Sequence, residues 1–198
     1  MNGFRIEDNI SYAMAPQGDR LLVGGQADGN RDNRVLRNYF FNATLQLGYS
    51  GKNHTDGHVR ENVLLDGSIV VHNYLDVEVR DNLVVGGGIN TDNCGQVTNQ
   101  RNQAFAKGKH ADAPRAFLIP NKYDPTRAHL AVFNWAGALT TQVKGAPFLK
   151  SGDKYQLLDP HDFFGKPLFA GKCEGEMMSV PIKGAFGAFV VLRGNRTN

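Results

Sequence analysis

His58-Val-Arg-Glu-Asn-Val-Leu-Leu65 recurs as Glu78-Val-Arg-Asp-Asn-Leu-Val-Val85, 20 residues further along the chain, with Val, Arg and Asn identical and the other apolar positions kept apolar. Weaker copies of this phrase occur upstream at 6–10 and 35–39, and a decayed copy follows at 99–103. A period this short predicts stacked coils, because each repeat is too small to bury a core alone. One asparagine occupies the same position in every copy, with spacings of 29, 24, 20 and 20 residues: Asn9, Asn38, Asn62, Asn82 and Asn102.

Each of these asparagines is predicted to lie at a bend between two short strands. Asparagine tolerates left-handed backbone angles, and its amide can pair with backbone groups that a sharp bend leaves unsatisfied. Stacked coils then align the amides in a structural ladder. Further apolar segments, at 21–23, 45–47, 69–71 and 89, give each coil about three strands. Alternation through the bend predicts two sets, with Val59, Val63 and Leu65 facing inward and Arg60, Glu61 and Leu64 facing elsewhere.

These coils resemble the right-handed parallel β-helix of the pectate-lyase and polygalacturonase type, in which asparagine ladders at one bend are common. The resemblance covers residues 1–105 and implies architecture only, because similar coils serve lyases, hydrolases, epimerases and phage tailspikes. A leucine-rich repeat is the nearest alternative, since it has an asparagine ladder at a similar period. It fits less well, because it requires Leu-x-x-Leu-x-Leu before the asparagine, and here those positions hold one apolar residue and charged ones.

The pattern changes after the last coil. Residues 106–114 are small and polar, which predicts a linker, and residues 115–198 hold seven apolar segments separated by turn residues. Three of them, Leu130-Ala-Val-Phe-Asn-Trp135, Ser151-Gly-Asp-Lys-Tyr-Gln-Leu-Leu-Asp159 and Phe189-Val-Val-Leu-Arg193, are similar to the small β-sandwich that ends many bacterial glycoside hydrolases. That module is an accessory domain and brings no catalytic residues. The expected fold class is therefore all-β, with right-handed parallel β-helix coils followed by a small antiparallel β-sandwich.

Composition and the chain start limit the class of protein. A net charge of +3, without Lys/Arg runs among aromatic residues, argues against nucleic acid as a partner. No stretch approaches the roughly 20 apolar residues of a membrane span, and residues 1–10 do not resemble a signal peptide. The chain opens directly in a repeat phrase, which predicts the C-terminal part of a longer protein and self-association through an exposed first coil. By resemblance, the expected location is extracellular or periplasmic.

Connections between coils are where a β-helix carries function, because the coil bodies are committed to packing. Three polar connections, at 26–32, 52–58 and 72–76, fall along one side if the coils stack in register. Their carboxylates, imidazoles and aromatic ring suit a polysaccharide, whose hydroxyls they bond and whose ring face they cover. The candidate substrate-binding residues are Asp28, Arg31, His54, Asp56, His58, His72, Tyr74 and Asp76. The alternative is a set of solvated turns, in which such residues are favoured for turn geometry alone.

Metal chemistry has weak support in the sequence. The segment 28–32 places oxygen ligands at alternate positions, as a calcium loop does, but its twelfth position is Tyr39 where a bidentate Glu is needed. Cys94 and Cys173 lack Cys-x-x-Cys spacing, and the pair His54/His58 precedes a strand instead of lying on a helix, so zinc is not expected. No cofactor is predicted, with calcium as the alternative.

The resemblance favours a secreted carbohydrate-active protein of the polysaccharide lyase or glycoside hydrolase type. Its catalytic residues are not identified, because the polygalacturonase motifs are absent apart from a lone Asn90-Thr-Asp92. The alternative, from a different class, is a non-catalytic cell-surface, adhesion or tailspike-like module in which the coils form a stiff spacer.

Overall fold

The computed structural model describes residues 2–15, 18–109 and 113–194. The chain divides into two compact units, Met1–His110 and Ala111–Asn198. Every regular element in the described ranges is a strand, and no helix there is long and apolar enough to cross a membrane. The boundary between the units falls inside the predicted linker 106–114, of which residues 110–112 lie outside the described ranges.

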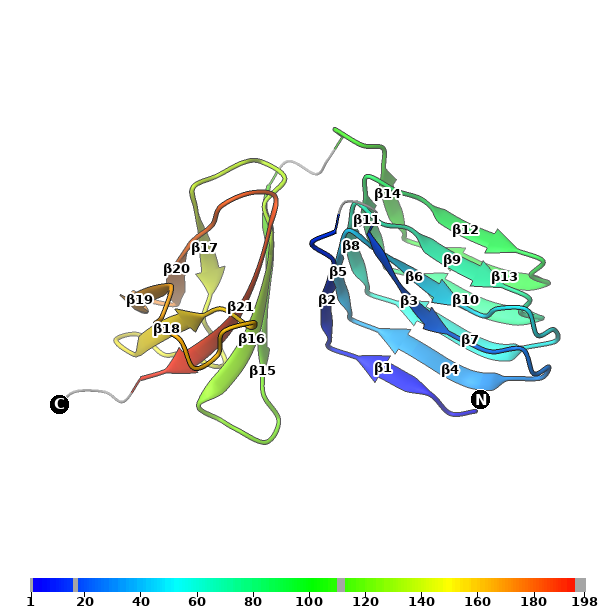
Figure 1. Ribbon diagram of the computed structural model, residues 1–198, viewed down its shortest axis with the longest axis horizontal. Helices are drawn as coiled ribbons and strands as arrows, with labels where there is room; N and C mark the ends of the chain where they lie inside the picture. Colours follow the sequence, from blue (N-terminus) through cyan, green and yellow to red (C-terminus); the bar gives the residue numbers. More distant parts are fainter. Residues whose placement is uncertain (1, 16–17, 110–112, 195–198) are drawn as a thin grey trace. The chain divides into compact units, whose positions relative to one another are not determined.

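The first unit is a parallel β-solenoid built from three sheets (Figure 1). The first sheet contains β1 (Arg5–Glu7), β4 (Arg31–Leu36), β7 (Thr55–Arg60), β10 (Asp76–Arg80) and β13 (Gln96–Gln100). The second contains β2 (Ile10–Tyr12), β5 (Tyr39–Phe41), β8 (Val63–Leu65), β11 (Leu83–Val85) and β14 (Gln103–Phe105). The third contains β3 (Asp19–Val23), β6 (Ala43–Leu47), β9 (Ile69–His72) and β12 (Ile89–Asp92). In the described residues the first four coils thus contribute three strands each, as the repeat predicts, and the last contributes two. Self-association through the first coil stays a prediction.

Strands of successive coils pair in register, so equivalent residues stack. Val35, Val59 and Val79 stack along the first sheet and are fully buried. In the second sheet the inward residue is Leu64, which belongs to the same core cluster. The predicted orientation of β8 is therefore wrong, because Leu64 faces inward and its neighbours Val63 and Leu65 project from the other face.

The physical reason lies in the bend before each asparagine. The residue directly preceding the asparagine has a left-handed backbone, with φ between 51° and 59°: Asp8, Arg37, Glu61, Asp81 and Arg101. This residue inserts one extra position into the alternation, so the inward phase shifts by one after the bend. The ladder asparagine itself does not have a positive φ angle, which corrects the prediction that it supplies the left-handed angle.

The asparagines instead supply hydrogen bonds from coil to coil. In the first four ladder asparagines, the backbone N–H and the side-chain Nδ2 donate to the Oδ1 of the asparagine one coil further on, at 2.9–3.1 Å. Asn38 and Asn62 are completely buried, and the ladder continues through Asn82 to Asn102. Because buried polar groups are costly unless bonded, this ladder fixes which residues stack.

The second unit is an antiparallel β-sandwich with the seven predicted strands. One sheet has the order β15 (Arg115–Pro120), β16 (Arg127–Phe133), β21 (Phe186–Arg193), β18 (Lys154–Leu158), β19 (Phe169–Lys172). The other pairs β17 (Thr140–Lys144) with β20 (Met177–Pro181). Residues of both sheets share one apolar core, which includes Leu130, Leu157, Val143 and Met178. The predicted all-β class, parallel coils followed by an antiparallel sandwich, is confirmed.

Candidate functional site

The polar connections between coils stack as their spacing predicts. His54 forms a bridge with Tyr74, and Gly57 pairs with Val77, so Asp56 lies one coil from Asp76. The backbone N–H of Asp56 donates to Oδ2 of Asp76 at 2.7 Å. The stacking therefore brings these two aspartates together at the start of β7 and β10.

Two of the eight candidate substrate-binding residues, which we call the predicted strip, lie inside the solenoid. His54 is fully buried and Tyr74 is 1% exposed. Nδ1 of His54 accepts a hydrogen bond from the Asn30 backbone at 3.2 Å, and the Tyr74 hydroxyl accepts one from Asn33 Nδ2 at 3.1 Å. Burial lowers the pKa of the His54 imidazole and raises that of the Tyr74 phenol. Because neither side chain reaches the surface, both belong to the core and are withdrawn from the candidate glycan contacts.

Three further strip residues come from elements other than β7 and β10, although Arg31 pairs with Thr55, the residue before Asp56. His72 ends β9 on the third sheet, where its Nδ1 is 3.5 Å from Oδ2 of Asp92. Asp28 lies in the connection before β4, and its Oδ1 accepts a hydrogen bond from the Lys52 backbone at 2.7 Å. Arg31 begins β4 and is exposed. The predicted strip is therefore not one continuous site.

The structure does build a smaller site on the outward face of β7, β10 and β13. A shallow depression of about 250 Å³ lies there, floored in part by the backbone of Gly57 and Val77. Its remaining lining side chains come from three successive coils: Asp56, His58, Asp76, Glu78, Gln96 and Thr98. We call this set the outward depression. Carboxylates, an imidazole, an amide and a hydroxyl thus open onto one surface.

Hydrogen bonds fix the tautomer of His58. The Arg60 guanidinium donates to Nδ1 of His58 at 2.7 Å, and a guanidinium has no acceptor atom. Nδ1 is therefore unprotonated, and Nε2 carries the proton that it donates to Oδ1 of Asp56 at 2.6 Å. Oε2 of Glu78 also lies 3.4 Å from Nδ1. The Arg60 contact is shorter, so the Nδ1 lone pair accepts its hydrogen bond from Arg60. The plane of the His58 ring is thus set by two partners, Arg60 and Asp56.

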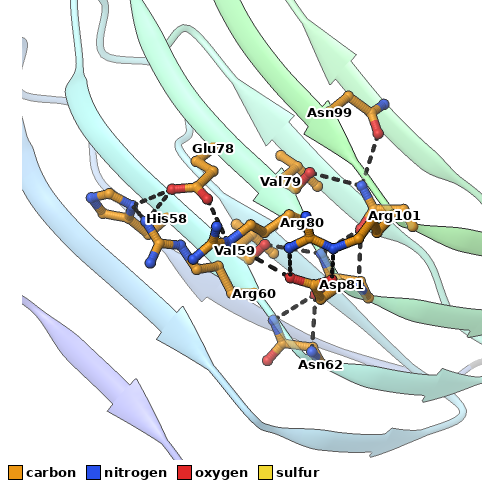
Figure 2. Close-up of polar contacts among 12 residues, drawn as sticks. His58, Val59, Arg60, Asn62, Glu78, Val79, Arg80, Asp81, Asn99 and Arg101 are labelled. Carbon is orange, nitrogen blue, oxygen red and sulfur yellow. Dashed lines mark hydrogen bonds and ion pairs between the residues drawn. The ribbon is translucent and has the colours of Figure 1, made fainter.

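Ion pairs between charged side chains link successive coils across this face (Figure 2). Glu78 pairs with Arg60 of the preceding coil, and its Oε1 lies 2.5 Å from Nε of Arg80. At the neighbouring bend, Arg101 donates to both oxygens of Asp81, at 2.6 and 2.7 Å. The Arg101 hydrogen bonds lower the pKa of the Asp81 carboxyl. This network holds Glu78 in place beside His58.

Glu78, Gln96 and Thr98 were not among the predicted site residues. The signal that identifies them is the alternation along the first sheet, because Asp56, His58 and Arg60 occupy every second position of β7. In-register stacking then places Glu78 and Thr98 in the row of His58, and Gln96 in the row of Asp56. Site residues can thus be identified by combining the two-residue alternation of side chains along a strand with the length of the repeat.

The structure gives no support to a metal site. In residues 2–15, 18–109 and 113–194, no group of three or more His, Cys, Asp or Glu side chains is arranged to hold an ion. In the calcium-like segment, Asp28 accepts a backbone hydrogen bond and Oδ1 of Asp32 lies 2.7 Å from Nε of Arg34. Both carboxylates therefore already have protein partners. Cys94 and Cys173 are free thiols.

No family model, curated protein sequence or solved structure matches this chain. The class of protein is therefore defined by the fold and the site alone. It is a two-unit all-β protein, in which a parallel β-solenoid presents a hydrogen-bonding depression on its first sheet and an antiparallel β-sandwich follows.

Proposed function

We propose that the outward depression binds a glycan, and that the chain acts in an extracellular or periplasmic carbohydrate-active protein of the polysaccharide lyase or glycoside hydrolase type. The observation that supports this function is the convergence of Asp56, His58 and Asp76 with an amide and a hydroxyl in one shallow depression. A sugar offers hydroxyl groups that both donate and accept, and this lining supplies both kinds of partner. Strand neighbours are about 4.8 Å apart, so side chains from adjacent coils can share one sugar unit.

The charges of the depression favour a neutral glycan over an acidic one. Asp56, Asp76 and Glu78 contribute carboxylates, and among the described residues Glu78 alone of the three forms ion pairs with arginines. Of the three histidines in the predicted strip, only His58 lines the depression. The cationic attraction for a uronate polymer that several clustered imidazoles would supply is therefore missing.

The test compares two matched His–Asp pairs on the solenoid surface. Asp56→Ala/His58→Ala removes the pair in the depression, and the control Asp92→Ala/His72→Ala removes the pair on the third sheet. Affinity electrophoresis against a panel of neutral and acidic polysaccharides should show binding of a neutral polymer by wild type. The first variant should bind about tenfold more weakly, since the Asp56 carboxylate and the imidazole that orients it are lost, and the control should bind as wild type does.

Both variants are first required to melt within a few degrees of wild type. Unchanged binding by Asp56→Ala/His58→Ala, or no binding of any polysaccharide by wild type, would return these residues to the solvated-turn interpretation.

A second candidate function is a non-catalytic spacer or adhesion module, and the ion pairs between coils favour it. Arg37 contacts both Glu7 and Asp8 at 2.9 Å, and Arg101 contacts Asp81 in the same way at the other end of the solenoid. Such pairs stiffen the stack without any ligand. This function predicts no binding of a neutral polysaccharide by the outward depression, so the neutral polymers of the panel separate the two proposals.

A further inference from the structure

A second depression lies on the sandwich, over β18, β19 and β21, and measures about 470 Å³. Tyr155 and Leu157 of β18 point into the apolar core. Because side chains alternate along a strand, Lys154 and Gln156 point outward. The strand pairing places Lys172 opposite Lys154, and it places Ala170 and Leu192 on either side of Gln156. The surface therefore consists of two lysines beside a small, flat floor of Gln156, Ala170 and Leu192. We call it the lysine depression.

The lysine pair is unfavourable unless an anion lies between the two ammonium groups. Like charges directly opposite each other on antiparallel strands destabilise the sheet. No aspartate or glutamate lines the lysine depression, and in the described part of the chain neither lysine has an acidic partner within 4.0 Å. By contrast, Nζ of Lys144 on the other sheet lies 3.4 Å from Glu176. Both Lys154 and Lys172 are exposed and free to close on a ligand.

Arg193 also lines the lysine depression, but its side chain lies on the Tyr155 face of the sheet. Arg193 pairs with Tyr155 across β21 and β18, and its guanidinium lies 5.7 Å from the centre of the Phe148 ring. Its Nη1 also donates to the Phe148 carbonyl at 3.3 Å. The guanidinium is thus held against Phe148, and the positive charge of the lysine depression comes from Lys154 and Lys172.

We propose that the lysine depression binds an anionic saccharide unit, with its carboxylate or sulfate oxygens between Lys154 and Lys172. The apolar face of the sugar ring then covers Ala170 and Leu192, and Gln156 bonds a hydroxyl group. A nucleic acid fits this surface poorly, because base stacking needs an exposed aromatic ring and the one aromatic residue in the lining, Tyr155, is buried. This site lies wholly in the second unit, so it stands or falls independently of the outward depression.

The experiment uses the full chain and four soluble probes: polygalacturonate, dextran sulfate, neutral dextran and a single-stranded oligonucleotide. Lys154→Gln/Lys172→Gln removes the pair, and Lys166→Gln/Lys183→Gln is the control, which lowers the net charge equally at exposed lysines outside the depression. Wild type should bind at least one anionic polysaccharide, more weakly as salt rises, and should not bind dextran through this site. The pair variant should lose about tenfold or more in affinity for that probe, while the control keeps it.

A third variant separates a ligand site from a structural role. Lys172→Glu places opposite charges across β18 and β19, so the melting temperature should rise or stay unchanged while binding of the anionic polysaccharide is lost. Polygalacturonate and dextran sulfate distinguish a carboxylate from a sulfate as the bound group. Equal loss in the pair variant and the control, preference for the oligonucleotide, or no binding of either anionic polysaccharide by wild type would overturn the proposal.

Discussion

Replacing Asn62 by alanine tests whether the asparagine ladder stabilises the solenoid. Its Oδ1 accepts hydrogen bonds from the backbone N–H and Nδ2 of Asn38, at 2.9 and 3.1 Å. Its Nδ2 donates to the Val35 carbonyl and to Oδ1 of Asn82, both at 3.0 Å. Alanine removes all four bonds. The Asn38 N–H then loses its acceptor and the Val35 carbonyl loses this donor, in an interior that water does not reach.

The magnitude follows from these two groups. A buried polar group without a partner costs about 1–3 kcal/mol, so Asn62→Ala should lower the free energy of unfolding by about 3 kcal/mol. Asn102→Ala is the matched control, because the Asn102 amide also makes four bonds, to Asn82, Val79 and Asn99. Asn102 is only half-buried at the last coil, so water can replace part of what is lost, and the cost should be about 1 kcal/mol.

Urea unfolding followed by far-ultraviolet circular dichroism measures both values. Asn62→Asp provides a further check, because a carboxylate keeps the acceptor role toward Asn38 but cannot donate to Val35, and it buries a charge. It should be at least as destabilising as Asn62→Ala. Equal costs for Asn62→Ala and Asn102→Ala, or a cost of Asn62→Ala well under 1 kcal/mol, would refute the view that buried ladder bonds hold the coils together.

Three further perturbations test other parts of the solenoid. Val79→Asp places a charge in the core and should prevent folding, whereas Gln100→Asp on the exposed outward side should leave the melting temperature within a few degrees of wild type; equal tolerance would reject the register. Gly67→Ala would drive its Cβ into a backbone carbonyl of the preceding coil and should destabilise strongly, while Gly88→Ala meets no atom within 4 Å and should be nearly neutral in the same melt. Burial lowers the pKa of His54, so the unfolded chain binds more protons than the folded one below about pH 6.5, and the stability contributed by this residue falls as pH drops. His54→Asn should therefore flatten the decline in unfolding free energy between pH 7 and 5, and an unchanged slope would show that His54 does not take part.

The repeat predicted the stacking of the chain because register is set by equivalent apolar residues. Val59 and Val79 recur at the same place in the phrase and pair across β7 and β10. The orientation of Leu64 was not predictable from alternation alone, because a single left-handed residue at the bend shifts the inward phase. A local backbone angle decides this shift, and the apolar pattern Val-Leu-Leu is compatible with either phase.

The site was predicted less well, because polar residue types do not show which way a side chain points. His54 and His58 look alike in the sequence, yet one lies in the core with Asn30 as its partner and the other lies on the outward face. Counting back in steps of two from the core residue Val59 identifies Gly57 as inward and His58 as outward. The count does not extend to His54, since the chain turns before β7. Asp56 and His58 were placed correctly beside Asp76 by the repeat length alone.

At each bend, one residue supplies the left-handed backbone angle, and the asparagine after it supplies the ladder hydrogen bonds. A left-handed angle at a residue with a side chain costs about 1–2 kcal/mol, and the chain accepts this at Arg37 and Arg101 where glycine would avoid it. Each of these arginines makes two contacts with an aspartate of the preceding coil, and exposed pairs of this kind contribute about 0–1 kcal/mol. The ion pairs of the charged bend residues therefore offset only part of the backbone cost, and these residues add no net stability. The stability of the solenoid must come from the apolar stack and the buried asparagine bonds. For this reason the residue that recurs in every repeat is the asparagine, and not the bend residue before it.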